Sequence, residues 1–314
     1  MKLKNVTIGL ASVALVLAAA GCAEKEDAGA QAPAVEDAQM QNGADATGSE
    51  TAEVAEGSAE AGSDTLATVI AGDHRTPEYA ARDQFRHPAE TLRFIGIEPD
   101  MTVVEIAPGG GWYTEILAPY LKQGGTFYAA HFPENSESSY YQRSLKAFKE
   151  KLAADQENYG KVILTEFDPA AGSEIAPAGS ADVVVTFRNV HNWMRGENEK
   201  QAFDSFFAAL KPGGVLGVVE HRAKPGTSRE DMISSGYVTQ DHVIEVAQQA
   251  GFELEEASEI NANPKDTADH PKGVWTLPPS LRLGDEDKDK YLAIGESDRM
   301  TLRFRKPDEA GSAD

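Results

Sequence analysis

Short apolar runs alternate along this chain with longer segments whose apolar residues recur at the spacing of one helix face. In the segment 140–154, for example, Leu145, Phe148 and Leu152 share such a face. The run at 181–187 is apolar almost throughout, as in a strand that is covered on both sides. The pattern predicts helices at 73–87, 89–95, 112–121, 140–154, 199–210 and 240–250, and strands at 102–107, 126–130, 162–166, 181–187, 215–220, 252–260 and 299–305.

This alternation predicts an α/β fold, with a mostly parallel seven-stranded sheet and helices on both faces. The last two strands, 252–260 and 299–305, have no core helix between them and predict a C-terminal antiparallel hairpin. An insertion at 261–297 interrupts the hairpin, and it is either a lid over a site or a solvated excursion. The domain is predicted to span residues 66–306, followed by a polar tail at 307–314.

The first 22 residues follow a different pattern. Lys2 and Lys4 precede an apolar run at 8–20, and small residues then lead to Cys22. This order is typical of a secretory signal, and the run is short for a transmembrane anchor. The cysteine resembles the lipidation site of bacterial lipoproteins. That resemblance implies a lipid anchor at Cys22 on the periplasmic side of the cell envelope, and Ala23 in place of Asp favours the outer membrane over the inner one.

Residues 23–65 contain almost no large apolar side chains. They carry eleven acids and one base, which is a net charge of −10 out of −22 for the whole chain. Such a segment buries too little surface to fold, so we predict a disordered acidic tether. The sequence has no basic patch, so it does not predict a nucleic-acid partner. Cys22 is the only cysteine, which excludes an intramolecular disulfide and leaves the mature domain without a thiolate nucleophile.

Three consecutive glycines, at 109–111, lie between the predicted strand 102–107 and the helix that follows it. Glycine loses backbone entropy on folding and adds no packing, so this junction indicates a ligand that lies against the bare backbone. The spacing differs from the Gly-x-Gly-x-x-Gly of dinucleotide sites, and no Lys-Ser/Thr pair follows as in a P-loop. Glu105, before the turn, suits a positively charged ligand or a sugar hydroxyl.

The segment Glu105-x-Ala107-x-Gly109-Gly110-Gly111 resembles the first motif of class I S-adenosylmethionine-dependent methyltransferases, which is commonly Glu/Asp-x-Gly-x-Gly-x-Gly. A second match, Leu-Lys-Pro-Gly-Gly at 210–214, resembles the turn before the fifth strand of that family. The resemblance covers roughly residues 70–306 and extends to a bacterial group of predicted methyltransferases. It implies a Rossmann-like sheet and transfer of a methyl group from S-adenosylmethionine to an unknown small-molecule or envelope acceptor.

The resemblance also implies roles for residues at the carboxyl ends of the strands, where such sheets bind ligands. The glycine turn would lie under the methionine part of the cofactor, and Glu105 would fix that turn. Asp168 would take the adenine amino group, although an Asx turn before Pro169 is an alternative. The implied cofactor-binding residues are Glu105, Ala107, Gly109, Gly110, Gly111, His131, Asp168, Asn189 and Val190.

One position departs from the family pattern. The family usually has Asp or Glu at the end of strand two, where it bonds the ribose hydroxyls, and this chain has His131 there. A neutral histidine can accept one hydroxyl bond, but it cannot offer the two acceptor oxygens of a carboxylate. Ribose recognition is therefore the weakest part of the resemblance.

Three histidines follow strand ends. His131 and His221 are separated by three strand spacings, roughly 14 Å, so one ion cannot bridge them. His191 and His221 follow neighbouring strands and could share an ion with Glu220, but we predict a polar pocket floor and no metal site. Methyl transfer requires a positioned nucleophile and often a base. His191 and His221 are the candidate catalytic bases, and each can equally be a structural hydrogen-bonding group.

Two other functions are open. The chain can be a non-catalytic exported binding protein that keeps this fold for another ligand. The missing strand-two acid favours that alternative, as does export away from a cytosolic cofactor. A nicotinamide oxidoreductase on a related sheet is disfavoured by the glycine spacing. A fold of this kind does not by itself fix the function.

The lipidation site generates a first prediction. Substituting Cys22→Ser should leave an unprocessed or soluble precursor, because the modified thiol is lost. Fractionation and mass spectrometry of the N-terminal peptide measure this. Wild-type mature protein that retains residues 1–21 would contradict the interpretation.

Overall fold

The structure is a computed structural model, and it describes residues 61–308, with side chains from residue 65 onward. The predictions for the signal segment, for Cys22 and for almost all of the acidic tether lie outside the described residues, as does most of the C-terminal tail. Among the residues described, no helix is both long and apolar enough to cross a membrane.

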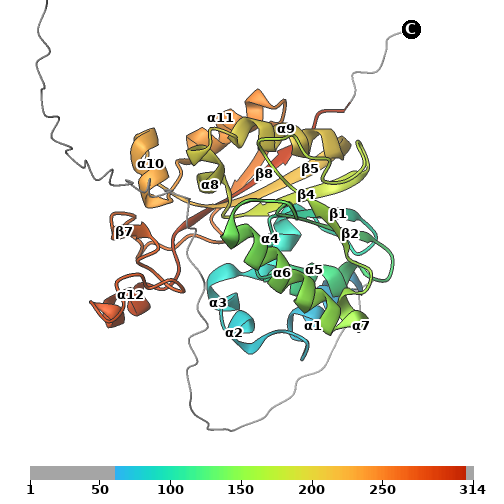
Figure 1. The fold of residues 1–314 in the computed structure, drawn as a ribbon, viewed down its shortest axis with the longest axis horizontal. Coiled ribbons are helices and arrows are strands. Elements are labelled where there is room, and N and C mark those ends of the chain that lie inside the picture. Colours follow the sequence, from blue (N-terminus) through green and yellow to red (C-terminus); the bar gives the residue numbers. More distant parts are fainter. Residues whose placement is uncertain (1–60, 309–314) are drawn as a thin grey trace, which may run out of the picture. The chain divides into compact units, whose positions relative to one another are not determined.

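Seven strands form one sheet in the order β3-β2-β1-β4-β5-β8-β6 (Figure 1). Strands β1 to β5 pair in parallel, and β8 is antiparallel to both β5 and β6. This arrangement confirms the predicted sheet and its C-terminal antiparallel hairpin. The strands are β1 (Thr102–Ile106), β2 (Thr126–His131), β3 (Ile163–Glu166), β4 (Ala181–Phe187), β5 (Leu210–His221), β6 (Glu253–Ser258) and β8 (Arg299–Arg305).

Helices cover both faces of the sheet (Figure 1). In β4, Val184 packs in the hydrophobic cluster of one face, while Val183 and Val185 pack in the cluster of the other face. Successive side chains of a strand point to opposite faces, so two covered faces explain the continuous apolar run. The helices are α1 (Ala61–Ile70), α2 (Pro77–Ala80), α3 (Asp83–Arg86), α4 (Pro88–Ile95), α5 (Thr114–Leu121), α6 (Ser139–Ala154), α7 (Gln156–Tyr159), α8 (Val190–Arg195), α9 (Glu199–Ala209), α10 (Arg229–Ser235), α11 (Gln240–Gln249) and α12 (Lys288–Ile294).

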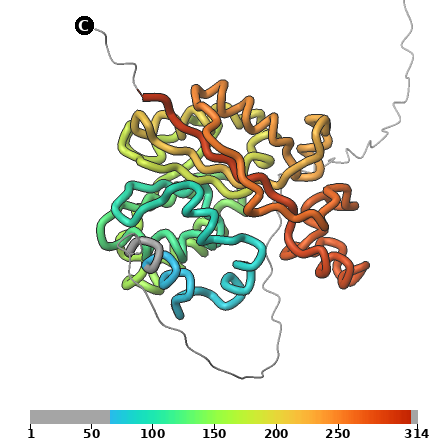
Figure 2. The backbone as a smooth tube through the Cα atoms, turned by 180° about the vertical axis from the view of Figure 1, so that it is seen from behind, coloured from blue at the N-terminus to red at the C-terminus, as the bar shows by residue number. Residues whose placement is uncertain are grey.

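The insertion between β6 and β8 is more regular than predicted. It contains the short strand β7 (Pro271–Val274), outside the main sheet, and the helix α12. The strand β7 packs against α10 (Figure 1). Figure 2 shows the chain leaving the insertion and crossing the domain as β8 toward its C-terminal end.

The folded domain begins earlier than the predicted boundary at residue 66. Helix α1 starts at Ala61, and Leu66 is 1% exposed in the same hydrophobic cluster as Ile116 and Leu117 of α5. The large apolar side chains of this helix begin only at Leu66, so the small or polar residues 61–65 gave no signal that would extend the predicted domain. Helix α1 is therefore part of the core.

We predict that Leu66→Ala lowers the free energy of unfolding by about 2–4 kcal/mol, because it leaves a cavity beside α5. For a domain of this size the thermal midpoint should fall by roughly 5–15 °C. Leu292→Ala in α12 is the control, since Leu292 is 39% exposed and should change the midpoint by only about 1–2 °C. Equal midpoints for the two variants would show that α1 does not stabilise the domain.

Candidate functional site

The glycine turn follows β1 at the point where the strand order reverses, with β2 on one side and β4 on the other. Three of its residues have left-handed backbone: Ala107 (φ 47°), Gly109 (φ 60°) and Gly111 (φ 83°). For an L-residue such as Ala107 this conformation costs roughly 1 kcal/mol. Ala107 occupies a position that is commonly glycine in the methyltransferase motif that this segment resembles. The turn therefore has a left-handed backbone at a residue for which that conformation is strained.

The three glycines face different surroundings. A Cβ atom on Gly109 would meet nothing within 4 Å, whereas one on Gly111 would lie 3.1 Å from Phe148. A Cβ on Gly110 would clash with the hydroxyl of Tyr79. Only Gly109 therefore presents bare backbone to open space. At Gly111 the positive φ and the nearby Phe148 ring are a reason for glycine within the fold itself, while its predicted contact with a ligand stays a prediction.

His131 is fully buried and supports this turn from the end of β2. The backbone N–H of Phe132 donates to its Nδ1 (2.8 Å), so Nε2 carries the proton and donates to the carbonyl of Gly109 (3.1 Å). Burial lowers the pKa of His131 to about 4. Both ring nitrogens are thus engaged, and the predicted hydrogen bond from a ribose hydroxyl to His131 has no acceptor left. The residue positions the turn instead.

Glu105 is 2% exposed at the end of β1. Its Oε2 accepts a hydrogen bond from the hydroxyl of Thr114 (2.6 Å) at the start of α5. Burial raises the pKa of Glu105 to about 7, and the Thr114 bond opposes part of this rise. Glu105 therefore links β1 to the helix beyond the turn, and it is close to half ionised at neutral pH.

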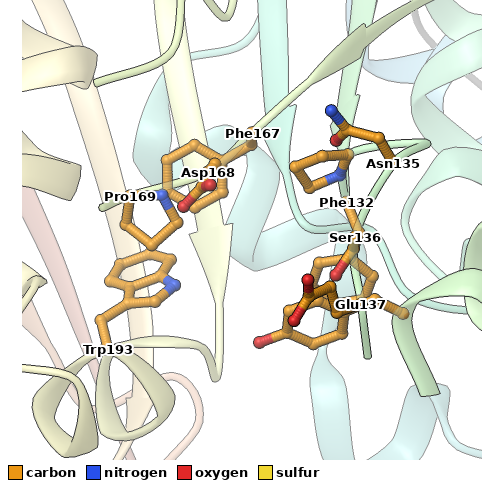
Figure 3. Close-up of a pocket in the computed structure, with 10 residues that line it drawn as sticks. Phe132, Asn135, Ser136, Glu137, Phe167, Asp168, Pro169 and Trp193 are labelled. Carbon is orange, nitrogen blue, oxygen red and sulfur yellow. The ribbon is translucent and has the colours of Figure 1, made fainter. Parts of the chain in front are cut away.

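A cavity of about 260 Å³ opens beyond the carboxyl ends of β2 and β3, next to α8 (Figure 3). Aromatic rings form much of its wall, and carboxylates from Asp168 and Glu137 lie on different sides of it (Figure 3). Asp168 Oδ1 also accepts from the backbone N–H of Ala170 (3.0 Å), so the Asx turn that was the alternative is present. The lining residues are Phe132, Pro133, Asn135, Ser136, Glu137, Tyr141, Phe167, Asp168, Pro169 and Trp193. Apart from Asp168, sequence reasoning assigned none of these to a binding pocket.

Asn189 and Val190 follow β4, as predicted, but their side chains are engaged within the protein. The amide of Asn189 donates to the carbonyl of Ile106 (3.1 Å) and to the hydroxyl of Thr186 (3.2 Å), which ties the ends of β1 and β4 together. Val190 is fully buried in the hydrophobic core.

The two candidate bases lie side by side. Nδ1 of His191 and Oε1 of Glu220 are 3.1 Å apart, and the rings of His191 and His221 are 5.5 Å apart. A carboxylate that orients an imidazole in this way leaves Nε2 of His191 available for proton transfer. On His221, Nδ1 contacts the hydroxyl of Ser297 (2.5 Å). Trp275, from the insertion, packs 6.1 Å from His191, so the insertion contributes to this part of the site.

His191, Glu220 and His221 offer ligand atoms within 4.8 Å of one another, which brings together the trio considered for a metal ion. The surrounding charge opposes a cation there. Burial first, and then His191 and the positive charges of Arg188, Arg299 and Arg86, hold the pKa of His221 well below its usual range. The same charges would repel a divalent cation.

No protein-family model and no curated protein matches the sequence. The fold is similar to solved methyltransferase structures. One is a protein from Galdieria sulphuraria described as a sarcosine dimethylglycine methyltransferase (TM-score 0.50, 13% identity, 75% of this chain and 91% of that one). Others are an S-adenosylmethionine-dependent methyltransferase from Aquifex aeolicus (0.48, 13%, 78% and 98%) and phosphoethanolamine N-methyltransferase 2 from Haemonchus contortus in complex with S-adenosylmethionine (0.49, 16%, 71% and 53%). The chain therefore has the Rossmann-like fold of the Galdieria sulphuraria protein.

Burial of Glu105 generates a stability prediction. The unfolded chain releases this proton near pH 4.5 and the folded chain near pH 7, so stability falls as pH rises through that window. Glu105→Gln removes the free-energy cost of ionising a buried carboxyl group, and its amide oxygen can still accept the hydrogen bond from Thr114. We expect the variant to be more stable than the wild type by on the order of 3 kcal/mol at pH 8, and by roughly 1 kcal/mol or less at pH 5.

Urea denaturation at the two pH values measures the difference. Glu253→Gln, at an exposed position of β6, is the control and should show no pH-dependent gain. A Glu105→Gln variant that is less stable than the wild type at pH 8 would mean that the carboxylate is compensated by a contact that the amide cannot make.

Proposed function

We propose that this chain is an S-adenosylmethionine-dependent methyltransferase acting on a small-molecule or envelope acceptor. The observation that carries the proposal is the open space over the backbone of Gly109, at the reversal of strand order. A Cβ at this position would fill space that the fold itself does not use. A carboxylate-bearing aromatic cavity opens beyond the end of the neighbouring strand β2. The similarity of the fold to solved methyltransferase structures supports the same proposed function.

The residues present fit such a cofactor. When bound, S-adenosylmethionine supplies an electrophilic methyl group on a positively charged sulfur. The backbone at Gly109 would hold its amino-acid part, and Glu105 would place negative charge beneath it. The aromatic walls of the cavity suit adenine, and Asp168 can accept from an adenine amino group through the oxygen that the Asx turn does not use.

Ribose recognition must use a residue other than His131. Glu137 lines the cavity and belongs to the loop just after His131, so its carboxylate supplies the two acceptor oxygens that the ring lacks. We propose Glu137 as the functional replacement for the usual strand-two acid. His131 contributes indirectly, because its hydrogen bond to the carbonyl of Gly109 positions the glycine turn.

His191 is the better placed of the two candidate bases. Glu220 orients its ring, and its Nε2 can take the proton that an acceptor nucleophile loses on methylation. Burial first, and then the neighbouring positive charges, lower the pKa of His221 and disfavour its protonation. We therefore assign proton removal to His191 and a positioning role to His221.

A non-catalytic binding protein is the second candidate function. The engagement of both nitrogens of His131 favours it, because the usual ribose contact at this position is absent. For either function we propose anchoring through a lipid on Cys22 at the periplasmic side of the envelope, which follows from the N-terminal sequence alone.

Binding of S-adenosylmethionine and of its demethylated product to the purified full-length chain tests the function. Gly109→Ala should weaken both ligands at least about tenfold, because the new methyl group enters the ligand space. Gly179→Ala is a matched control: its φ of 64° is close to the 60° of Gly109, and its Cβ would also meet nothing within 4 Å. Both variants carry similar backbone strain, so only the first should lose affinity. Failure of both ligands to bind the wild type at millimolar concentration would overturn the proposal.

Glu105→Gln provides a second readout at pH 8, where Glu105 is mostly ionised. The variant should lose more affinity for positively charged S-adenosylmethionine than for the product, which lacks the charge on sulfur. Isothermal titration of both ligands measures this difference. Equal losses would show that Glu105 shapes the turn without sensing the charge of the cofactor.

A further inference from the structure

Four arginine side chains gather around one buried glutamate between the N-terminal helices and the ends of β4 and β8. Arg82 and Arg86 each donate through Nε to Glu296, at 2.6 and 3.1 Å. Nη2 of Arg299 lies 3.1 Å from the same carboxylate. The surrounding positive charges, of which Arg86 and Arg299 act most strongly, hold the pKa of Glu296 well below its usual range despite its burial.

The fourth arginine, Arg188, directly follows β4 and has a left-handed backbone with φ of 62°. Burial lowers its pKa, and so does the charge of Arg86 and Arg82, while Glu296 is the acid that acts against this effect. Within residues 65–308, no hydrogen bond or ion pair engages its guanidinium. A guanidinium stays charged at neutral pH, so Arg188 is an uncompensated cation in this cluster.

Positive charge in the cluster exceeds negative charge. Glu296 is the one carboxylate shared by Arg82, Arg86 and Arg299, while nearby Asp298 is already paired with Arg222 (2.8 Å). Nη1 and Nη2 of Arg86, and Nη2 of Arg82, are buried without a hydrogen-bond partner. The side chain of Arg86 is 1% exposed, and burial of such donors without a partner is costly. The cluster has donors and charge that the described protein does not satisfy.

The cluster borders the candidate active site. The guanidinium of Arg86 lies 4.6 Å from the ring of Trp112, directly after the glycine turn. The next residue, Tyr113, stacks on Phe187 (3.6 Å between ring centroids), and Phe187 precedes Arg188. Arg86, Arg188 and Arg299 all act on the pKa of Tyr113 and on that of His221. Arg86 is therefore in contact with the residue that follows the glycine turn, and Arg188 follows the partner of Tyr113 in the chain.

We propose that the acceptor of this enzyme carries an oxyanion, a carboxylate or a phosphate group, which binds the partly exposed Arg188 and is attracted by the charge of the nearby, buried Arg86. This inference rests on the proposed methyltransferase function and names its substrate class. The planar fork of arginine matches either group with paired hydrogen bonds, and an anion here supplies the missing negative charge. Arg82 is 18% exposed and Arg188 is partly exposed, so the cluster can be reached from solvent. The oxyanion serves as the point of recognition, and the methylated atom belongs to another part of the acceptor.

The tests use the full-length chain with two probes, inorganic phosphate and malonate, against sodium chloride at equal ionic strength. Titration calorimetry should detect at least one probe in the millimolar range, with or without the demethylated cofactor product. Arg188→Gln should weaken that probe about 10- to 100-fold, the range expected for loss of one charged hydrogen-bonded partner. Arg188→Lys keeps the charge but loses the planar fork. Its affinity for the probe should therefore lie between that of the wild type and that of Arg188→Gln. Arg143→Gln, at an exposed position of α6, is the control and should stay within about twofold of the wild type.

Two results would overturn the inference: absence of binding of both probes at 10 mM, or an equal effect of Arg188→Gln and Arg143→Gln. Circular dichroism and thermal melting of each variant separate loss of binding from loss of fold. The glycine variant distinguishes this inference from the proposed function. Gly109→Ala should weaken the demethylated product and spare the probes. A wild type that binds a probe but no cofactor would keep the anion site and overturn the methyltransferase function.

Discussion

Because apolar side chains cover both faces of the sheet, polar groups of this domain can reach a ligand only at the ends of its strands. The parallel strands all end at one edge, and β1 lies where the strand order reverses there. Glu105, His131, Arg188 and Glu220 belong to four different strand ends and so lie at this edge. The candidate functional side chains gather at this edge because the positions within the sheet are filled by the apolar core.

The ion pairs of Glu296 join segments that are distant in sequence. Arg82 lies between α2 and α3, Arg86 ends α3, Arg299 begins β8, and Glu296 lies near the end of the insertion. The insertion thereby contributes to the edge of the sheet, as it also does through Trp275 and Ser297. The carboxylate fixes these elements relative to one another, and the surplus of arginines then sets the sign of the charge that a ligand must bring.

The sequence predicted the sheet well, since strand and helix periodicities are local properties of the chain. The run 181–187 agrees with β4 at both ends, and the glycine turn was recognised from its position after a strand. The role of His131 was not predictable, because it depends on a carbonyl 22 positions earlier in the chain and on the N–H of its own neighbour. The pairing of Arg86 with Glu296 was not predictable for the same reason, because the two residues are separated by 210 positions. The distinction between Gly109 and Gly111 also needed coordinates, since it depends on whether Phe148 lies nearby.

Several features at this edge reduce the stability of the domain. Ala107 adopts a conformation that suits glycine, Glu105 is buried with one hydroxyl donor, and Arg86 is buried with two unsatisfied nitrogens. Each of these features costs roughly 1–3 kcal/mol. A fold selected for stability alone would replace these groups by apolar ones of similar size. At this edge, a ligand with both positive and negative groups would compensate the buried charges of Glu105 and Arg86. A sulfonium cofactor over Glu105 and an oxyanion on the arginines satisfy the two requirements at adjacent positions.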